Sequence, residues 1–158
     1  MREQFLPFSP PYLGEEEIAE VVDSLRSGWI TTGPKTKRFE QEFRDYVGAP
    51  AALALSSCTA ALHTALVLAG IGTDDEVITT PVTFTATVAV IEHTGARPIL
   101  VDVEPDTMNI DPAQVRAAVT PRTRAVIAVH YGGHPCDLDA LRAAVSYTHL
   151  TLPTSDLV

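Results

Sequence analysis

The chain has few cysteines, few basic residues and no long apolar run. Cys58 and Cys136 are its only cysteines and form no CxxC pair, so we expect reduced thiols in a cytoplasmic protein. The sequence contains eleven Lys and Arg but twenty Asp and Glu, which gives a net charge of −9. This argues against a nucleic-acid partner, because phosphate backbones are bound mainly by basic residues.

Membrane and secretory segments are not expected either. No apolar run approaches the roughly 18 residues that cross a bilayer, and residues 1–8 have neither the apolar core nor the cleavage site of a secretory signal. The composition is instead that of a soluble globular protein, with 46% hydrophobic residues in a chain of 158. That length suffices for one domain with a hydrophobic core.

The order of elements predicts an α/β fold. Two helices are expected first, at residues 15–27 and 34–47, from apolar residues at helical spacing. Strand and helix then alternate, with strands at 51–56, 76–80, 98–103 and 124–130 and helices at 59–69, 83–93, 111–119 and 138–145. Continuous apolar strands separated by helices indicate a largely parallel sheet covered by helices on both faces. We expect this to be one domain over residues 1–145.

The last residues, 146–158, depart from this pattern. They are rich in Thr and Ser and have no helical stripe, whereas a further apolar strand should follow the helix at 138–145. We interpret them as a frameshifted or chimeric end, with an ordinary disordered terminus as the alternative.

The turn at residues 56–62 is a candidate anion site. A strand end, small residues and a helix start leave backbone N–H groups unpaired at the positive end of a helix dipole, which suits a phosphate. The hydroxyls of Ser57 and Thr59 would add donors, although Ser and Thr are also ordinary N-caps. The turn lacks the GxxxxGK(S/T) pattern of a Walker loop. No GxGxxG follows a strand either, which argues against a dinucleotide-binding fold.

Phe84 and His130 each follow a predicted strand. Ligands of open α/β sheets bind beyond the carboxyl ends of the strands, so Phe84 would offer a flat face to an aromatic ligand there. Burial of Phe84 as helix core is the alternative. His130 could face the same crevice.

Residues 130–137 contain His, Cys and Asp but match no established zinc spacing. Gly132, Gly133 and Pro135 indicate a turn instead, with Asp137 capping the next helix. We therefore expect no metal site.

Five segments in this order and spacing resemble the DegT/DnrJ group of pyridoxal-phosphate-dependent nucleotide-sugar aminotransferases: residues 27–34, 56–63, 75–81, 95–103 and 129–139. The resemblance runs from about residue 5 to 145. It implies the large domain of a type I pyridoxal-phosphate transferase and a homodimer with active sites at the subunit interface. It also implies transfer of an amino group from glutamate to a keto-sugar nucleotide, in amino-sugar or polysaccharide biosynthesis.

The resemblance also implies roles for individual residues. Cys58 and Thr59, with Ser57 beside them, match the turn that holds the phosphate of pyridoxal 5′-phosphate, and Phe84 matches the aromatic residue stacked on its ring. Trp29, Thr31 and Gly33 lie in a loop that resembles a segment near the substrate, and His130 is expected on the substrate side.

The family's catalytic groups have no match in this chain. The aspartate that pairs with the pyridine nitrogen and the Schiff-base lysine follow later in the family, and Lys35 and Lys37, the only lysines, match neither position. We therefore expect no catalytic residue here and an inactive N-terminal fragment. The alternatives are a sugar dehydratase of the same family, with histidine in place of the lysine, and a non-catalytic phosphate-binding or interaction module.

Overall fold

The computed structural model describes residues 10–145. The chain divides into two compact units, an N-terminal unit (Met1–Ala54) and a C-terminal unit (Leu55–Val158), and each is described by itself. The predicted tail at 146–158 lies outside the described residues. The assignment of residues 1–145 to one domain stays a prediction.

The N-terminal unit contains two helices, α1 (Glu15–Ser27) and α2 (Pro34–Val47), with the bounds that the sequence predicts. Three glutamates in the first turn of α1 suit the positive end of its dipole. Gly14 N–H donates to Glu17 Oε2 at 2.7 Å. The helix ends at Gly28, whose φ of 72° lies in the left-handed region that glycine adopts readily. Pro34 is the first residue of α2, a position whose backbone N–H would have no acceptor within the helix.

Ion pairs join α1 to α2. Lys35 Nζ lies 2.8 Å from Asp23 Oδ2 and also pairs with the Glu20 carboxylate, which Arg38 Nη2 approaches to 3.1 Å. Hydrogen bonds from Lys35 and then Arg38 lower the pKa of Glu20. Bonds to Asp23 and then Glu20 raise the pKa of Lys35. Lys35 is therefore a charged partner that connects two helices.

The C-terminal unit is an α/β layer structure around a three-stranded parallel sheet of order β2-β1-β3. Its elements are α3 (Cys58–Leu68), β1 (Glu76–Thr79), α4 (Ala86–His93), β2 (Arg97–Leu100), α5 (Pro112–Ala118), β3 (Thr123–Val126), the short 3-10 helix η1 (Tyr131–Gly133) and α6 (Leu138–Val145). Val77 of the central strand is opposite Pro98 on one side and Ala125 on the other.

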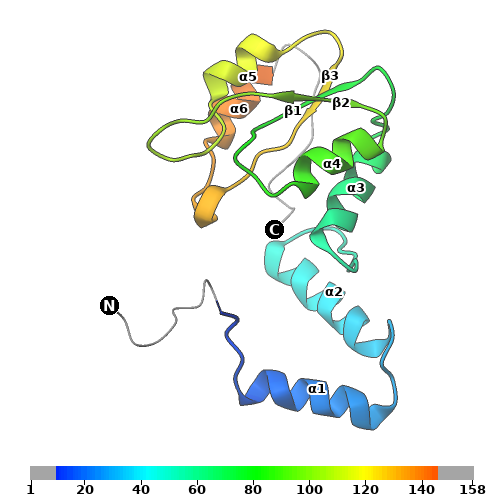
Figure 1. Ribbon diagram of the computed structural model, residues 1–158. Helices are drawn as coiled ribbons and strands as arrows, with labels where there is room; N and C mark the ends of the chain where they lie inside the picture. The colour runs from blue at the N-terminus through cyan, green and yellow to red at the C-terminus, as the bar shows by residue number, and fades with distance from the viewer. Residues whose placement is uncertain (1–9, 146–158) are drawn as a thin grey trace. The chain divides into compact units, whose positions relative to one another are not determined.

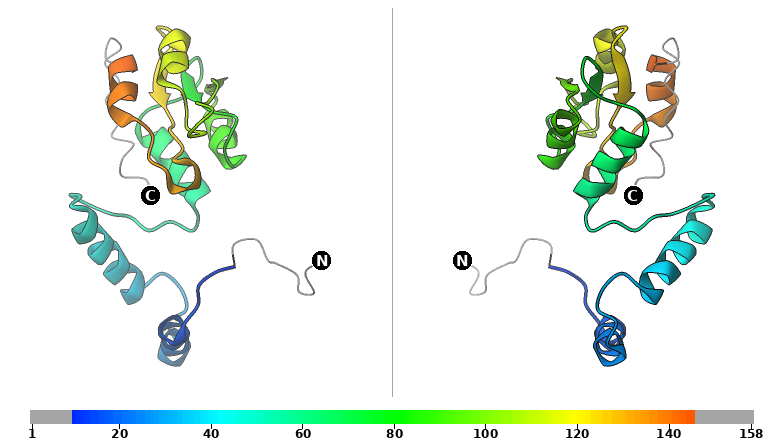
Figure 2. Two further views of the ribbon diagram at one scale, coloured as in Figure 1. Left: turned by 90° about the vertical axis from the view of Figure 1, so that its left-hand side faces the viewer. Right: turned by 90° about the vertical axis from the view of Figure 1, so that its right-hand side faces the viewer.

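Helices cover both faces of the sheet, as predicted (Figures 1 and 2). Val77 and its neighbour Ile78 are fully buried and point to opposite faces, because side chains alternate along a strand. Val77 packs in a cluster with Leu66 of α3 and Ile91 of α4. Ile78 packs in a second cluster with Val115 of α5 and with residues of α6. The two clusters hold the carboxyl ends of the strands in place.

The predicted strand at 51–56 is wrong. These residues form no strand, and among residues 10–145 no strand pairs with them. The Ala54 amide instead donates to Glu40 Oε1 at 2.9 Å, and the Leu53 side chain is 71% exposed. Apolar composition favours a strand, but the strand forms only where a neighbouring edge accepts its backbone hydrogen bonds.

The two later predicted strands end earlier than expected. Residues 101–103 follow β2 as irregular chain, where Val103 forms an isolated antiparallel bridge with Ile110. Residues 127–130 likewise follow β3 without strand structure, although Ile127 N–H still donates to the Ile78 carbonyl at 2.9 Å. The chain therefore leaves the sheet near Leu100 and Val126.

Candidate functional site

The turn before α3 combines a helix cap with free amide donors. Ser57 is the N-cap in extended conformation, and its Oγ accepts the Ala60 amide at 3.1 Å. The amides of Cys58 and Thr59 precede any possible intrahelical acceptor, and neither has a partner within residues 10–145. The Ser57 hydroxyl oxygen thus caps the helix. The N–H groups of Cys58 and Thr59 remain available to bind an anion at the positive end of the helix dipole.

Phe84 lies in the turn between β1 and α4, at the carboxyl side of the central strand. Its side chain is 80% exposed, so the alternative of a buried core residue is wrong. The turn is held by its own threonines: Thr80 Oγ1 accepts the Val82 amide at 3.1 Å, and the hydroxyls of Thr83 and Thr87 are 2.8 Å apart. The fold therefore presents an uncovered aromatic ring beside this edge of the sheet.

His130 follows β3, the strand next to β1. The carboxyl ends of adjacent parallel strands meet at one edge of the sheet, so the segments that carry Phe84 and His130 leave from the same edge. His130 is half-buried, and its Nδ1 accepts the Cys136 amide at 3.0 Å. Because an Nδ1 that accepts a hydrogen bond carries no proton, the ring proton resides on Nε2.

Bonds among neighbouring residues contribute to the shape of the turn at 131–137. The buried Cys136 thiol donates to the Val129 carbonyl at 3.2 Å, and burial raises its pKa. Asp137 Oδ1 accepts the Ala140 amide at 2.9 Å, which confirms the predicted cap of α6. Among residues 10–145, no three His, Cys, Asp or Glu side chains gather as a metal site would require.

Asn109 belongs to this arrangement and was missed by the sequence analysis. Its side chain is 3% exposed and bonds to the backbone of the segment after His130. No local motif marks it. The nearest signal is the neighbouring Met108, whose φ of 59° is unusual for a residue with a side chain.

Trp29, Thr31 and Gly33 lie in the loop between α1 and α2 of the N-terminal unit. The indole of Trp29 is 57% exposed, and its Nε1 donates to the Thr32 carbonyl at 3.0 Å. Gly33 is buried under that indole, and a Cβ at this position would overlap the ring. Thr31 is exposed. A role of these three residues beside Phe84 and His130 stays a prediction.

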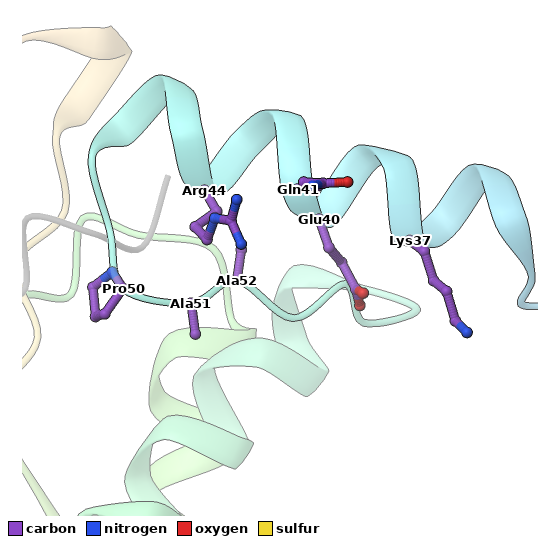
Figure 3. A pocket seen from close by; sticks show the side chains of 7 residues that line it. All are labelled: Lys37, Glu40, Gln41, Arg44, Pro50, Ala51 and Ala52. Atoms are coloured by element: carbon purple, nitrogen blue, oxygen red, sulfur yellow. The ribbon is translucent and has the colours of Figure 1, made fainter.

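One hollow in the N-terminal unit contains none of the predicted site residues (Figure 3). It encloses about 270 Å³ and is lined by Lys37, Glu40, Gln41, Arg44, Pro50, Ala51 and Ala52. Two of its three charged side chains already have partners, since Glu40 accepts the Ala54 amide and Arg44 Nη2 lies 2.6 Å from Asp45 Oδ1. We therefore place the candidate site at the α3 turn and the edge of the sheet.

In the part of the chain that the structure describes, no helix is both long and apolar enough to span a bilayer.

Comparison with known proteins identifies the family of this chain. The model of the DegT/DnrJ/EryC1/StrS aminotransferase family matches residues 11–153. The spore coat polysaccharide biosynthesis protein SpsC of Bacillus subtilis is 54% identical over 148 residues, which are 94% of this chain and 38% of that protein.

Solved structures show the same fold. The chain resembles a putative sugar aminotransferase, Spr1654 of Streptococcus pneumoniae in its PLP form, with a TM-score of 0.85 and 46% identity over 90% of this chain and 36% of that one. An aminotransferase from Psychrobacter cryohalolentis gives a TM-score of 0.84 and 37% identity, over 91% of this chain and 37% of that one.

The chain thus spans little more than a third of the length of these relatives. Within that span its α/β layers are those of pyridoxal-phosphate-dependent aminotransferases, as the sequence predicts. It belongs to the DegT/DnrJ/EryC1/StrS aminotransferase family.

Proposed function

We propose that this chain forms the part of a pyridoxal-phosphate-dependent nucleotide-sugar aminotransferase that binds the cofactor's phosphate and one face of its ring. The observation that carries the proposal is the turn before α3, where the Cys58 and Thr59 amides have no partner among residues 10–145 at the start of an 11-residue helix. A phosphate dianion suits these donors because its charge also interacts favourably with the helix dipole.

The ring of the cofactor suits Phe84. An aromatic side chain that is 80% exposed is costly to leave in water, and stacking on a second ring recovers apolar contact area. α3 and α4 pack against each other in one cluster, so the two elements that begin beside Cys58 and Phe84 form one rigid support. When bound, pyridoxal phosphate supplies the electron sink for amino transfer; the residues named here bind and orient it.

The substrate side follows from family membership. The names of SpsC and Spr1654 support a sugar substrate and a place in polysaccharide biosynthesis. We propose a nucleotide-linked keto-sugar as acceptor and glutamate as amino donor. His130 would donate Nε2–H to this substrate, and Trp29, Thr31 and Gly33 would lie near it. We propose a cytoplasmic homodimer for the whole enzyme.

This chain is proposed to bind without catalysing. Lys35 and Lys37 are its only lysines. Lys35 is held protonated by Asp23 and Glu20, whose bonds raise its pKa, which makes it a poor nucleophile. Lys37 lies on α2 beside the hollow of Figure 3.

The test is the affinity of the 158-residue chain for pyridoxamine 5′-phosphate, compared with pyridoxamine, by calorimetry. Neither compound condenses with lysine, so Lys35 and Lys37 do not interfere. We expect Cys58→Pro to weaken binding of the phosphate form about ten-fold or more, because one charge-assisted hydrogen bond is worth roughly 1.5–3 kcal/mol. The substitution removes the amide donor at the first helical position, where proline is accommodated, and the preceding Ser57 is already extended.

Cys58→Ala is the matched control, because it removes the thiol and keeps the amide. It should bind like the wild type. Equal affinity for the two compounds, or a Cys58→Pro variant that binds as tightly as Cys58→Ala, would show that the α3 turn does not hold the phosphate.

A further inference from the structure

Asn109 uses its whole side-chain amide on one segment. Its Nδ2 donates to the carbonyls of His134 at 3.0 Å and Pro135 at 3.1 Å, and its Oδ1 accepts the Tyr131 amide at 2.9 Å. The orientation of the amide is unambiguous, because two carbonyl partners require the NH₂ group and one N–H partner requires the oxygen. Asn109 is 3% exposed, so its amide depends on these three backbone partners and not on water.

The bonded segment is the turn that follows His130. Two backbone bonds close it, from Gly133 N–H to the His130 carbonyl and from His134 N–H to the Tyr131 carbonyl, both at 3.0 Å. Gly132 and Gly133 adopt positive φ values of 60° and 82°, and glycine loses more conformational freedom than any other residue when its backbone is fixed. Asn109, from a distant part of the chain, supplies contacts at both ends of the turn.

The turn decides which nitrogen of His130 carries the proton. At the end of the turn the chain comes back beside His130, and the Cys136 amide donates a hydrogen bond to His130 Nδ1 at 3.0 Å. The ring proton is thereby confined to Nε2, and Nε2 has no hydrogen-bond partner among residues 10–145. Without the turn, the proton could occupy either nitrogen.

We propose that Asn109 is the positioning residue for His130: it holds the 131–135 turn so that the Cys136 amide occupies Nδ1 and the ring offers Nε2–H to an acceptor oxygen of the substrate. The part about the substrate rests on the proposed function. The part about the ring proton depends only on contacts within this chain.

The chemistry requires asparagine and not merely a polar residue. Aspartate has the same shape and can still accept the Tyr131 amide, but its second oxygen would face the His134 and Pro135 carbonyls, so two attractive contacts would become repulsive. Alanine removes all three bonds, so the Tyr131 amide and the His134 and Pro135 carbonyls lose their shared partner. Both changes release the turn, by different means.

The experiment measures the ring nitrogens of His130 by long-range ¹H–¹⁵N NMR on the labelled full chain, at a pH where the ring is neutral. In the wild type we expect the Nε2–H form almost alone. In Asn109→Asp and Asn109→Ala we expect the Nδ1–H form to become appreciable, as in an unconstrained imidazole. Ile110→Val is the control, because it perturbs the fully buried neighbour of Asn109 without touching these bonds, and it should keep the wild-type form.

The result that overturns the proposal can come from several measurements. A wild-type His130 with its proton on Nδ1 would do so without any variant, which protects the test if the Asn109 variants fold poorly. An unchanged His130 tautomer in folded Asn109→Asp would also overturn the proposal. So would an Ile110→Val variant that loses the Nε2–H form as the Asn109 variants do. Failure of pyridoxamine phosphate to bind at the α3 turn would refute the proposed function and leave the tautomer result standing.

Discussion

Gly33 and Trp29 constrain one another at the scale of single residues. The backbone of Gly33 is extended, with a φ of −166°, a conformation open to any amino acid. What requires glycine is the indole of Trp29, which occupies the space that a Cβ would need. The bond from Trp29 Nε1 to the Thr32 carbonyl keeps the ring there. This contact gives a physical reason for the sequence Trp29–Gly33 that does not depend on a substrate.

Gly33→Ala should therefore displace the indole and break its bond to Thr32. Trp29 is the only tryptophan, so its fluorescence reports this loop alone. We expect a red-shifted emission and stronger quenching by acrylamide, since the ring loses its packed face. Thr31→Ala, an exposed position in the same loop, is the control and should leave the spectrum unchanged. A Gly33→Ala protein with the wild-type spectrum would mean that the ring does not rest on Gly33.

At the scale of elements, β1 is tied at its amino end by a buried carboxylate. Glu76 is 3% exposed. Its Oε2 accepts the Thr120 hydroxyl at 2.6 Å, and its Oε1 accepts Nε and Nη2 of Arg122 at 3.0 and 2.6 Å. The bond from Thr120, and then those from Arg122, lower the pKa of Glu76. These contacts join β1 to the segment that leads into β3, at the end opposite to Phe84.

The lowered pKa predicts a dependence of stability on pH. A carboxyl whose pKa is depressed by folding stabilises the protein above its unfolded value of about 4.3, and this contribution is lost as the pH falls through the folded pKa. Glu76→Gln should thus be destabilised relative to wild type at pH 7, and the difference should shrink below about pH 4.3. Urea unfolding between pH 3 and 7 measures it. The exposed Glu92 provides the control variant Glu92→Gln, and a pH-independent difference for Glu76→Gln would contradict the argument.

The elements differ in how far the sequence could predict them. α2 has the predicted bounds because its start and end depend on local chemistry, Pro34 at the first position and Gly48 with a φ of 69° after the last. The strand at 51–56 failed because pairing depends on a partner distant in sequence. In the candidate site, the amides before α3 follow from local pattern, whereas the spacing of Phe84 allows both exposure and burial and only the structure shows an exposed ring. The bonds of Asn109 do not follow from local pattern, since 22 to 26 positions separate it from its partners.

At the scale of the whole molecule, burial is unequal along the chain. Within residues 10–145, all buried hydrophobic residues lie between Leu66 and Ala144, in the C-terminal unit. Neither α1 nor α2 contains a buried residue. Their apolar side chains are exposed instead, with exposed fractions of 59% for Val21 and 56% for Phe39. The stability of the chain therefore resides in the two clusters on either side of β1.

Hydrogen exchange should reveal this division. Amides of β1 are expected to exchange only through opening of the whole sheet, whereas those of α1 and α2 should exchange through local opening and hence far faster. Ile78→Ala should lower the protection of β1 by about 2–5 kcal/mol, the usual effect of truncating a fully buried isoleucine. Val67→Ala, at a 55% exposed position of α3, should change it by only about 0.5 kcal/mol or less. If α1 and α2 prove as protected as β1, their apolar faces must be covered. Protection that rises with protein concentration would then identify a second copy of the chain as the cover, which is how the proposed homodimer would become visible in this third of the enzyme.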